Sequence, residues 1–342
     1  MATELSTGAV AAAFHERQRA REAARLSALA QPSYPADRVR DEPDCGLRTP
    51  IQRDRDRIVH SKAFRRLKHK TQVFVAPAGD HFRTRLTHTL EVTGIARTVA
   101  RALDLNEDLV EAIGLGHDLG HPPFGHIGEA VLDDCLREHD GRRFRHFEHS
   151  LRVVTVLEPL NLNSSVRDGI LSHSGRSPQP QTLEGRIVRL VDRIAYLNHD
   201  IDDAIRAGVL DERALPAGPI ALLGTTGSQR IDTLVHDLVE HSEEAGDIVQ
   251  GAQAAVEMDA LRDFMFSEVY LAEAARREHL KIETVLRKLW RFYLEDPDRV
   301  PDGGGIPGAD PAQRVVDYLA GMTDRFAVNA FETLFVPRGF EA

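Results

Sequence analysis

The stretch that decides the fold of this chain is His117-Asp-Leu-Gly-His-Pro-Pro-Phe-Gly-His-Ile-Gly-Glu129. It continues an apolar helical pattern at residues 109–115, and Pro122 and Pro123 disfavour helical geometry in the residues before them. We therefore expect this helix to end near Gly120. Neighbouring side chains on a helix point about 100° apart. An adjacent His and Asp can therefore contact the same group only if that group lies at the end of the helix. A metal ion is such a group.

Two further polar residues lie inside helical apolar patterns. His88 shares one helix face with the aliphatic residues at positions 92, 95 and 99, and Asp192 lies in the apolar run 186–196. A bare imidazole or carboxylate is costly to bury without a partner. Each residue alone is more often an ordinary core or surface group. Together, His88, His117, Asp118 and Asp192 predict a nitrogen and oxygen site for one divalent metal ion, with no choice among Mn²⁺, Mg²⁺, Fe²⁺, Co²⁺ and Ni²⁺.

A second pair of chemical groups follows the two prolines. Gly125 lets the chain turn into a new helix, on which His126 and Glu129 stand three residues apart on one face. The carboxylate can orient the imidazole and favour its protonated form. The alternative is an ordinary surface pair, but beside a metal site we favour a catalytic dyad. His121 is expected on the turn next to the metal.

The chain resembles a known family at these positions. His88, His117-Asp118 and Asp192 are similar to the H…HD…D signature of the HD-domain metal-dependent phosphohydrolases. Three longer strings resemble the deoxyguanosinetriphosphate triphosphohydrolase branch, at residues 48–67, 79–91 and 192–200, with a weaker echo at 317–326. The resemblance spans about residues 48–208. It implies an all-α HD-domain helical bundle with additional N- and C-terminal helices, and cleavage of deoxynucleoside triphosphates (dNTPs) to deoxynucleoside and tripolyphosphate.

The resemblance also implies a set of substrate contacts. Gln72 would bond the 3′-hydroxyl of the sugar, and Val73 would crowd out a 2′-hydroxyl. Arg85 matches an arginine on the α-phosphate. Tyr196 and Asp200 match sugar contacts, although Tyr196 by itself is more typical of core packing.

The same resemblance distributes the catalytic roles. His126, held by Glu129, would donate the proton to the 5′-oxygen, with His121 and His146 stabilising phosphate charge. His126 as a nucleophile is a competing assignment. Relatives usually carry Asn and Gln where this chain has Phe147 and His149, which leaves the substrate range or the local geometry open.

Composition narrows the class of protein. With 342 residues the chain can bury a large core, and its two cysteines, Cys45 and Cys135, are too few for a disulfide framework or a thiolate metal site. No apolar run approaches the roughly 18 residues that span a bilayer. We expect a soluble, cytoplasmic protein with an N-terminal helix and loop at 1–50, an HD catalytic core at 51–210 and a C-terminal helical region at 211–342.

A basic run contrasts with the formal net charge of −10. Residues 53–70 hold eight Lys and Arg against two Asp. This run is compatible with binding of substrate phosphates or of an allosteric dNTP, with an ordinary solvated helix face, or with a weak single-stranded nucleic-acid contact. The resemblance further implies a homo-oligomer, a hexamer in that family. Other functions stay open: an HD phosphohydrolase acting on a nucleoside monophosphate, cyclic nucleotide or alarmone, or a non-catalytic nucleotide- or nucleic-acid-binding scaffold.

The remaining chain is expected to be helical. Helices are predicted at about 8–30, 231–241, 252–294 with an interruption, and from 311 onward, and the long helix around Asp192 should be capped by Thr182 and ended by Gly208. Loops are predicted at 32–50 and 174–180, with a break at 215–227.

Overall fold

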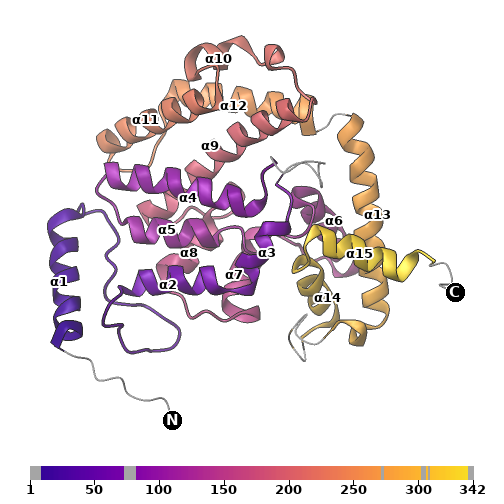
Figure 1. Ribbon diagram of the computed structural model, residues 1–342, viewed down its shortest axis with the longest axis horizontal. Coiled ribbons are helices and arrows are strands. Elements are labelled where there is room, and N and C mark those ends of the chain that lie inside the picture. The colour runs from indigo at the N-terminus through magenta and orange to yellow at the C-terminus, as the bar shows by residue number, and fades with distance from the viewer. Residues whose placement is uncertain (1–8, 73–81, 271–272, 302–305, 307–308, 338–342) are drawn as a thin grey trace.

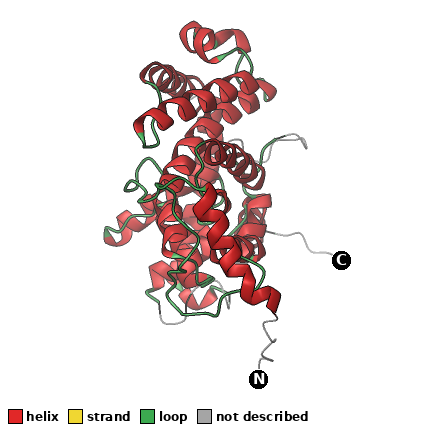
Figure 2. Ribbon diagram, turned by 90° about the vertical axis from the view of Figure 1, so that its left-hand side faces the viewer, coloured by secondary structure: helices red, strands yellow, loops and turns green. Residues whose placement is uncertain are grey.

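The computed structural model describes residues 9–72, 82–270, 273–301, 306 and 309–337, and over these residues the protein is helical (Figure 2). No strand occurs among them, and the one extended pairing is an isolated bridge between Thr71 and Thr84. The expected all-α class is confirmed.

The α-helices follow one another along the whole described chain. The first eight are α1 (Ala9–Arg25), α2 (Pro50–His60), α3 (Lys62–Arg66), α4 (Arg85–Ala102), α5 (Glu107–Gly116), α6 (Gly125–Asp140), α7 (His146–Arg152) and α8 (Ser164–Ser172). The others are α9 (Leu183–Arg206), α10 (Ala217–Leu223), α11 (Gly227–Ala245), α12 (Ala252–Met265), α13 (Glu273–Glu295), α14 (Pro311–Ala320) and α15 (Asp324–Phe335). Short 3-10 or π-helical turns are η1 (Leu67–His69), η2 (Val153–Leu157), η3 (Glu212–Ala214), η4 (Phe266–Tyr270) and η5 (Pro297–Arg299).

Side-chain caps begin the helices that carry the predicted site. The Thr84 side chain accepts from the backbone N–H of Thr87 at the start of α4, and the Thr87 side chain accepts in return from the backbone N–H of Thr84. Thr182 caps α9 as predicted, by accepting from the N–H of Gly185. Such caps satisfy N–H groups that have no partner inside the helix.

The main hydrophobic core lies between α4, α5 and α9, with α2 and α8 alongside α5 (Figure 1). Its buried members include Val92, Ile113 and Val191. Helices α4 and α5 approach so closely that a Cβ added at Gly114 would lie 2.6 Å from the Thr93 hydroxyl. This packing brings the start of α4, the end of α5 and the middle of α9 to one place.

A second hydrophobic cluster joins α6 to the C-terminal helices α13, α14 and α15, which lie together at one end of the molecule (Figure 1). Leu132 of α6 and Leu286 of α13 are fully buried there. The C-terminal helices therefore pack against the helix that carries the predicted catalytic dyad.

The structure corrects two predicted boundaries. The predicted break at 215–227 contains α10, because a proline is tolerated in the first turn, where its missing N–H would be unpaired anyway. The helix predicted at 231–241 extends to the bounds of α11, since Thr226 and Gln229 form a capping box before it. The expected interruption of 252–294 occurs at η4. None of the described helices is long and apolar enough to cross a membrane.

Candidate active site

The structure brings the four predicted metal ligands together from α4, from the turn directly after α5 and from α9. The His88 Nε2 lies 3.0 Å from the Asp192 Oδ1, and the His117 Nε2 lies 3.8 Å from that same oxygen and 3.6 Å from the Asp118 Oδ2. The side chains of His88, His117 and Asp118 are buried. The predicted convergence at the end of α5 is therefore present in the geometry.

The orientation of His117 fits a divalent cation. Its Nδ1 donates to the Gly114 carbonyl oxygen at 2.6 Å, so its Nε2 faces the carboxylates. This buried Nε2 has no hydrogen-bond partner in the described part of the chain. A backbone carbonyl on the far nitrogen is the usual way to orient a metal-binding histidine. The residues present thus suit a metal with nitrogen and oxygen ligands.

The two aspartates of this group are held in their charged form. Burial would raise the pKa of Asp118, but the charges of His117 and Arg85 keep it well below its usual value. Burial opposes ionisation of Asp192 as well, yet the hydrogen bond from His88 and the charge of His117 lower its pKa to about 2. Two carboxylates in one buried cluster provide the negative charge that a cation would neutralise.

Arg85 lies beside this group with unused donors. Its Nη1 donates to the Asp118 Oδ2 at 2.6 Å. The Nε and Nη2 atoms are buried, and neither has a partner among the residues described. Unpaired guanidinium donors in a buried site suit a phosphate, because their planar arrangement matches its oxygens.

Glu129 joins two histidines. Its Oε2 lies 3.2 Å from the His126 Nδ1, and its Oε1 lies 2.9 Å from the His146 Nδ1 and accepts from the His146 backbone N–H at 3.1 Å. Burial would raise the pKa of Glu129, but the hydrogen bonds to His126 and His146 hold it far below its usual range. The His126 side chain is 75% exposed, so this imidazole faces outward while its carboxylate partner is buried.

His121 stands between these groups. It is buried, and its ring stacks on that of His146 with 4.6 Å between centroids. Neither ring nitrogen has a hydrogen-bond partner within the described residues. Burial, with the nearby charge of Arg85, lowers the pKa of His121 well below its usual value. It is therefore a neutral imidazole with both nitrogens available to a ligand.

The loop that carries His121 and His126 is held by close backbone packing. Phe124 adopts the left-handed conformation, with φ of 63°, and Gly125 follows with φ of 60°. A Cβ at Gly128 would lie 1.9 Å from the Pro123 carbonyl oxygen. Glycine at position 128 is therefore required for the turn that aims His126.

The C-terminal helices also hold this loop. The Lys70 ammonium is buried and donates to the carbonyl oxygens of His121 and Ala320. Burial lowers the pKa of Lys70 to about 7. Asp324 accepts through its two oxygens from the backbone N–H groups of Thr71 and Phe124, both at 2.9 Å.

The predicted sugar contacts are placed as follows. Gln72 has a buried Oε1, Asp200 is buried and Tyr196 is partly buried on α9. The Tyr270 hydroxyl donates to the Asp200 Oδ2, whereas the Oδ1 of Asp200 and the Oε1 of Gln72 find no partner in the described chain. Burial raises the pKa of Asp200 to about 7. Val73 lies outside the described residues.

The two departures from the family pattern are both buried. The His149 Nδ1 lies 3.8 Å from the Asp317 Oδ1 on α14, and Phe147 is in ring contact with His146. His149 is also in ring contact with Phe144, a member of the second hydrophobic cluster. Packing against Asp317 and Phe144 accounts for His149 here.

Sequence reasoning missed two histidines in the same cluster. His173, after α8, has its Nδ1 2.7 Å from the Ile170 carbonyl oxygen and its Nε2 3.2 Å from the His146 Nε2. His199 stacks edge-on against His88 at 5.9 Å. A signal for His199 was its place seven residues after Asp192, two turns along one face of α9. No local pattern marks His173.

The basic run at 53–70 is largely engaged within the protein. Arg53 and Arg57 both pair with Glu42, and Arg55 pairs with Asp56 at 2.7 Å. These pairs leave less free positive charge than the sequence indicates.

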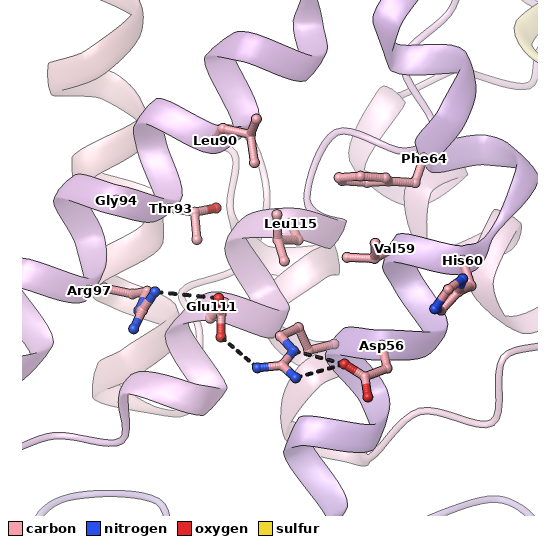
Figure 3. Close-up of a pocket in the computed structure, with 11 residues that line it drawn as sticks. Asp56, Val59, His60, Phe64, Leu90, Thr93, Gly94, Arg97, Glu111 and Leu115 are labelled. Atoms are coloured by element: carbon pink, nitrogen blue, oxygen red, sulfur yellow. Dashed lines mark hydrogen bonds and ion pairs between the residues drawn. The ribbon is translucent and has the colours of Figure 1, made fainter.

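A groove with a volume of about 430 Å³ lies between α2, α3, α4 and α5 (Figure 3). The ion pairs Arg55–Glu111 and Arg97–Glu111, at 3.3 and 3.4 Å, form a charged row along one side. The apolar lining residues are Val59, Phe64, Leu90 and Leu115. None of the predicted site residues lines this groove.

Comparison with known proteins agrees with the arrangement of the site. The HD domain family matches residues 85–197, and the phosphohydrolase-associated domain family matches residues 248–333. A deoxyguanosinetriphosphate triphosphohydrolase-like protein of Caldanaerobacter subterraneus subsp. tengcongensis is 50% identical over 308 residues, which cover 88% of this chain and 89% of that protein. This chain belongs to the same HD-domain family, the deoxyguanosinetriphosphate triphosphohydrolase-like proteins.

Other relatives in the deoxyguanosinetriphosphate triphosphohydrolase-like family cover nearly the whole chain. The protein of Desulfatibacillum aliphaticivorans is 44% identical over 95% of this chain and 98% of its own length. That of Bordetella parapertussis is 39% identical over 90% of this chain and 96% of its own length. A solved structure of a hypothetical protein from Aquifex aeolicus is also similar, with a TM-score of 0.49 and 20% identity, over 90% of this chain and 74% of that one. The family match makes the protein an HD-domain phosphohydrolase, and its matched HD domain contains all four predicted metal ligands.

Proposed function

We propose that this phosphohydrolase cleaves dNTPs, dGTP among them, into deoxynucleoside and tripolyphosphate. The observation that carries the proposal is Arg85. Its buried guanidinium keeps two nitrogens unpaired in the described chain while it contacts Asp118 at the predicted metal group. Such an arginine suits a phosphate placed next to a cation. The names of the relatives support a dGTP-like substrate.

A divalent ion held by His88, His117, Asp118 and Asp192 would supply Lewis-acid polarisation of the phosphate that is attacked. The other roles belong to side chains. Arg85 orients the α-phosphate, and the neutral His121 offers hydrogen bonds to phosphate oxygens. The fold holds these buried donors in place before substrate binds. Little free energy is therefore spent on reorienting them during the reaction.

His126 is the proposed proton donor to the 5′-oxygen of the leaving deoxynucleoside. Its Nδ1 donates to the anionic Glu129, which orients the ring and leaves Nε2 to carry the proton that is transferred. The exposed position of the ring allows it to meet a substrate that enters from solvent. His126 as the nucleophile is the competing assignment. In it the imidazole bonds to the α-phosphorus, the bond to the 5′-oxygen breaks and releases the deoxynucleoside, and water then frees tripolyphosphate from the triphosphohistidine.

Two buried oxygens are proposed to select the sugar. They are the Gln72 Oε1 and the Asp200 Oδ1, and neither has a hydrogen-bond partner in the described residues. Each fits a donating hydroxyl such as the 3′-hydroxyl of deoxyribose, because a buried acceptor gains most from a donor brought by the ligand. Tyr196 lies on the same helix as Asp200 and completes this proposed contact. Val73 is proposed as the residue that excludes a 2′-hydroxyl.

From the family resemblance we also infer a cytoplasmic homo-oligomer, a hexamer, with an allosteric dNTP as a second ligand. Several arginines of the 53–70 run already form ion pairs within the protein, so we favour the allosteric dNTP over a nucleic-acid contact at this run. Sedimentation with and without dNTPs measures the assembly.

The experiment that tests the function is a product assay. The protein is incubated with Mn²⁺ and each of the four dNTPs and four ribonucleoside triphosphates, and with nucleoside monophosphates, cyclic nucleotides and a guanosine alarmone. We expect tripolyphosphate and deoxynucleoside in equal amounts from dNTPs. Release of pyrophosphate or orthophosphate as the first product, or turnover of the other substrates only, would reject the proposal.

A variant separates chemistry from binding. His126→Ala should keep its metal and its dNTP affinity but lose at least about 10²-fold in kcat, the usual scale of general acid–base catalysis. The matched control is His236→Ala, which removes another exposed histidine, 3.7 Å from Asp232 on a helix surface. Near-full kcat in His126→Ala would transfer the role to His121 or His146. Trapping a triphosphohistidine in the unmodified protein would support the nucleophile assignment instead.

A further inference from the structure

Two buried carboxylates lie one turn apart on α6. Glu129 and Asp133 are four residues apart, so both side chains leave the same face of the helix. Glu129 orients His126 in the proposed mechanism, whereas Asp133 has no part in it. A buried carboxylate is costly unless specific partners satisfy it, so the partners of Asp133 indicate what it does.

The chain returns along α6 after this helix ends. Gly141 ends α6 in the left-handed conformation, with φ of 81°, and the chain then leads back to α7. Phe144 thereby meets Asp133, and His146 meets Glu129 one turn nearer the start of α6. Each carboxylate accepts a hydrogen bond from a backbone N–H group, at 2.9 Å from Phe144 and at 3.1 Å from His146.

Asp133 holds this returning segment with further contacts. Its Oδ1 also accepts from the Arg143 Nε at 2.8 Å and lies 3.1 Å from the Arg145 Nη1, while its Oδ2 lies 2.7 Å from the Arg143 Nη2. Burial would raise the pKa of Asp133, but the hydrogen bonds from Arg143 and Phe144 keep it below its usual value. The charged carboxylate therefore contacts three consecutive residues directly before His146.

The start of α7 depends on the other carboxylate. The N-cap residue of α7, Arg145, makes no side-chain capping bond, and the backbone N–H of His146 is bonded to Glu129 instead. The same oxygen of Glu129 lies 2.9 Å from the His146 Nδ1. One carboxylate oxygen thus fixes both the backbone and the ring of His146, and it reaches both only while the segment before His146 keeps its place.

The direction of the His146 ring matters to the site. With its Nδ1 on Glu129, its Nε2 lies 3.2 Å from the Nε2 of the buried His173, and the ring stacks on His121 at 4.6 Å between centroids. A displacement of about 1 Å in such a group can cost about 10²-fold in rate. Contacts that fix the backbone of His146 therefore bear on the reaction.

We propose that Asp133 is a positioning residue for His146. Asp133 and Glu129 together form a carboxylate clamp, the two side chains of α6 that hold residues 143–146, and this clamp aims the imidazole at the phosphate oxygens. Asp133 acts only through the backbone that carries His146. The proposal rests on the proposed function in one respect, the action of His146 on phosphate charge.

A double-mutant cycle with His146 tests this role, using the full chain with Mn²⁺ and dGTP. Asp133→Ala should lower kcat about 10-fold with KM within about 2-fold, because a misplaced imidazole stabilises the transition state less. In a His146→Ala background the same substitution should change kcat less than about 2-fold, because the group that Asp133 positions is gone. The fall in Tm should be similar in both backgrounds, since the bonds to residues 143–145 do not involve the imidazole. A full loss of kcat in the His146→Ala background would overturn the proposal.

Asp134→Ala is the matched control. Asp134 is the next residue on α6, but it is 40% exposed and pairs with Arg137 and, at 3.8 Å, with Arg287. This variant should retain its kcat. Asp133→Asn replaces Asp133→Ala if the alanine variant does not fold, and it should lower kcat at least about 2-fold, only where His146 is present. Full kcat in every folded Asp133 variant would overturn the proposal.

A second measurement needs no substrate. Amide hydrogen exchange, followed by mass spectrometry with fragmentation to single residues, reports the backbone N–H groups of Phe144 and His146. In the folded Asp133 variant we expect faster exchange at both amides, because release of the Phe144 amide frees the segment that presents His146 to Glu129. Unchanged protection at His146 would overturn the carboxylate clamp.

The outcomes for function are separate. Release of tripolyphosphate from dGTP, together with unchanged protection of the His146 amide, would overturn the carboxylate clamp and leave the proposed function standing. Other products from dGTP, together with faster exchange at His146, would do the reverse.

Discussion

The contact of the C-terminal helices with the active-site loop can be tested at Asp324. This residue begins α15, and its carboxylate accepts hydrogen bonds from the backbone N–H groups of Thr71 and Phe124, both at 2.9 Å. The side chain is almost fully buried, so water cannot easily replace it. Asp324→Ala removes both acceptors and leaves the two amides without a partner.

The magnitude follows from those two hydrogen bonds. A buried donor left without an acceptor costs about 1–3 kcal/mol, and the Thr71 amide, which is only partly buried, should lie at the low end. We expect a loss of about 3 kcal/mol in the free energy of unfolding. At about 2.1 cal/mol/K per residue, 342 residues give an unfolding entropy of roughly 0.7 kcal/mol/K, so Tm should fall by about 4 °C.

Activity should fall with stability, because the Phe124 amide holds the turn that aims His126. We expect kcat to drop at least about 10-fold while bound metal is unchanged, since the metal group lies on α4, α5 and α9. Scanning calorimetry, a tripolyphosphate assay and elemental analysis measure the three quantities. Asp263→Ala is the control, because that aspartate is 74% exposed and pairs with Arg262 at the surface, where a pair contributes little. Unchanged Tm and kcat in Asp324→Ala would refute the anchoring role.

Three further perturbations probe other parts of the site. Gly128→Ala should lower kcat about 10²-fold with metal retained, because its Cβ would collide with the Pro123 carbonyl. Gly175→Ala is the control and should leave kcat unchanged, because no described atom lies within 4 Å of its Cβ. Equal kcat values for the two variants would contradict the role of Gly128. Asp200→Asn should raise Tm at pH 8 but not at pH 4. Burial raises the pKa of Asp200 to about 7, so the folded state binds this proton more tightly than the unfolded state, and the aspartate loses stability as pH rises from about 4 to about 7. A Tm difference that is independent of pH would count against that ionisation. Removal of divalent ions by a chelator should lower Tm by several degrees, because the buried carboxylates then lack their cation, and Mn²⁺ should restore it; identical melting curves would argue against a metal bound to the folded state.

Local patterns were enough for part of the fold and of the candidate site. The apolar helix before the His-Asp pair, the turn at the prolines and the facing of His126 and Glu129 each depend on residues within about four positions of one another. That helix ends at Gly116 and not near Gly120 as predicted. The cap at Thr182 was predicted for the same reason. Proline and glycine predict breaks at α10 and α11, but the first turn of a helix tolerates both, so the two helices begin within the predicted break.

The sequence by itself therefore determined the helical class, the residues that converge at the end of α5 and the family. Only the tertiary structure decided which histidines share a carboxylate, that His173 joins His146, and that Lys70 and Asp324 hold the active-site loop. The Lys70 and Asp324 contacts join residues 51 to 253 positions apart in the chain, and the His146 pairs join residues 17 and 27 positions apart. Periodicity reports which face of a helix is buried, but the partner on the other side is selected by the packing of whole helices, which no local pattern contains.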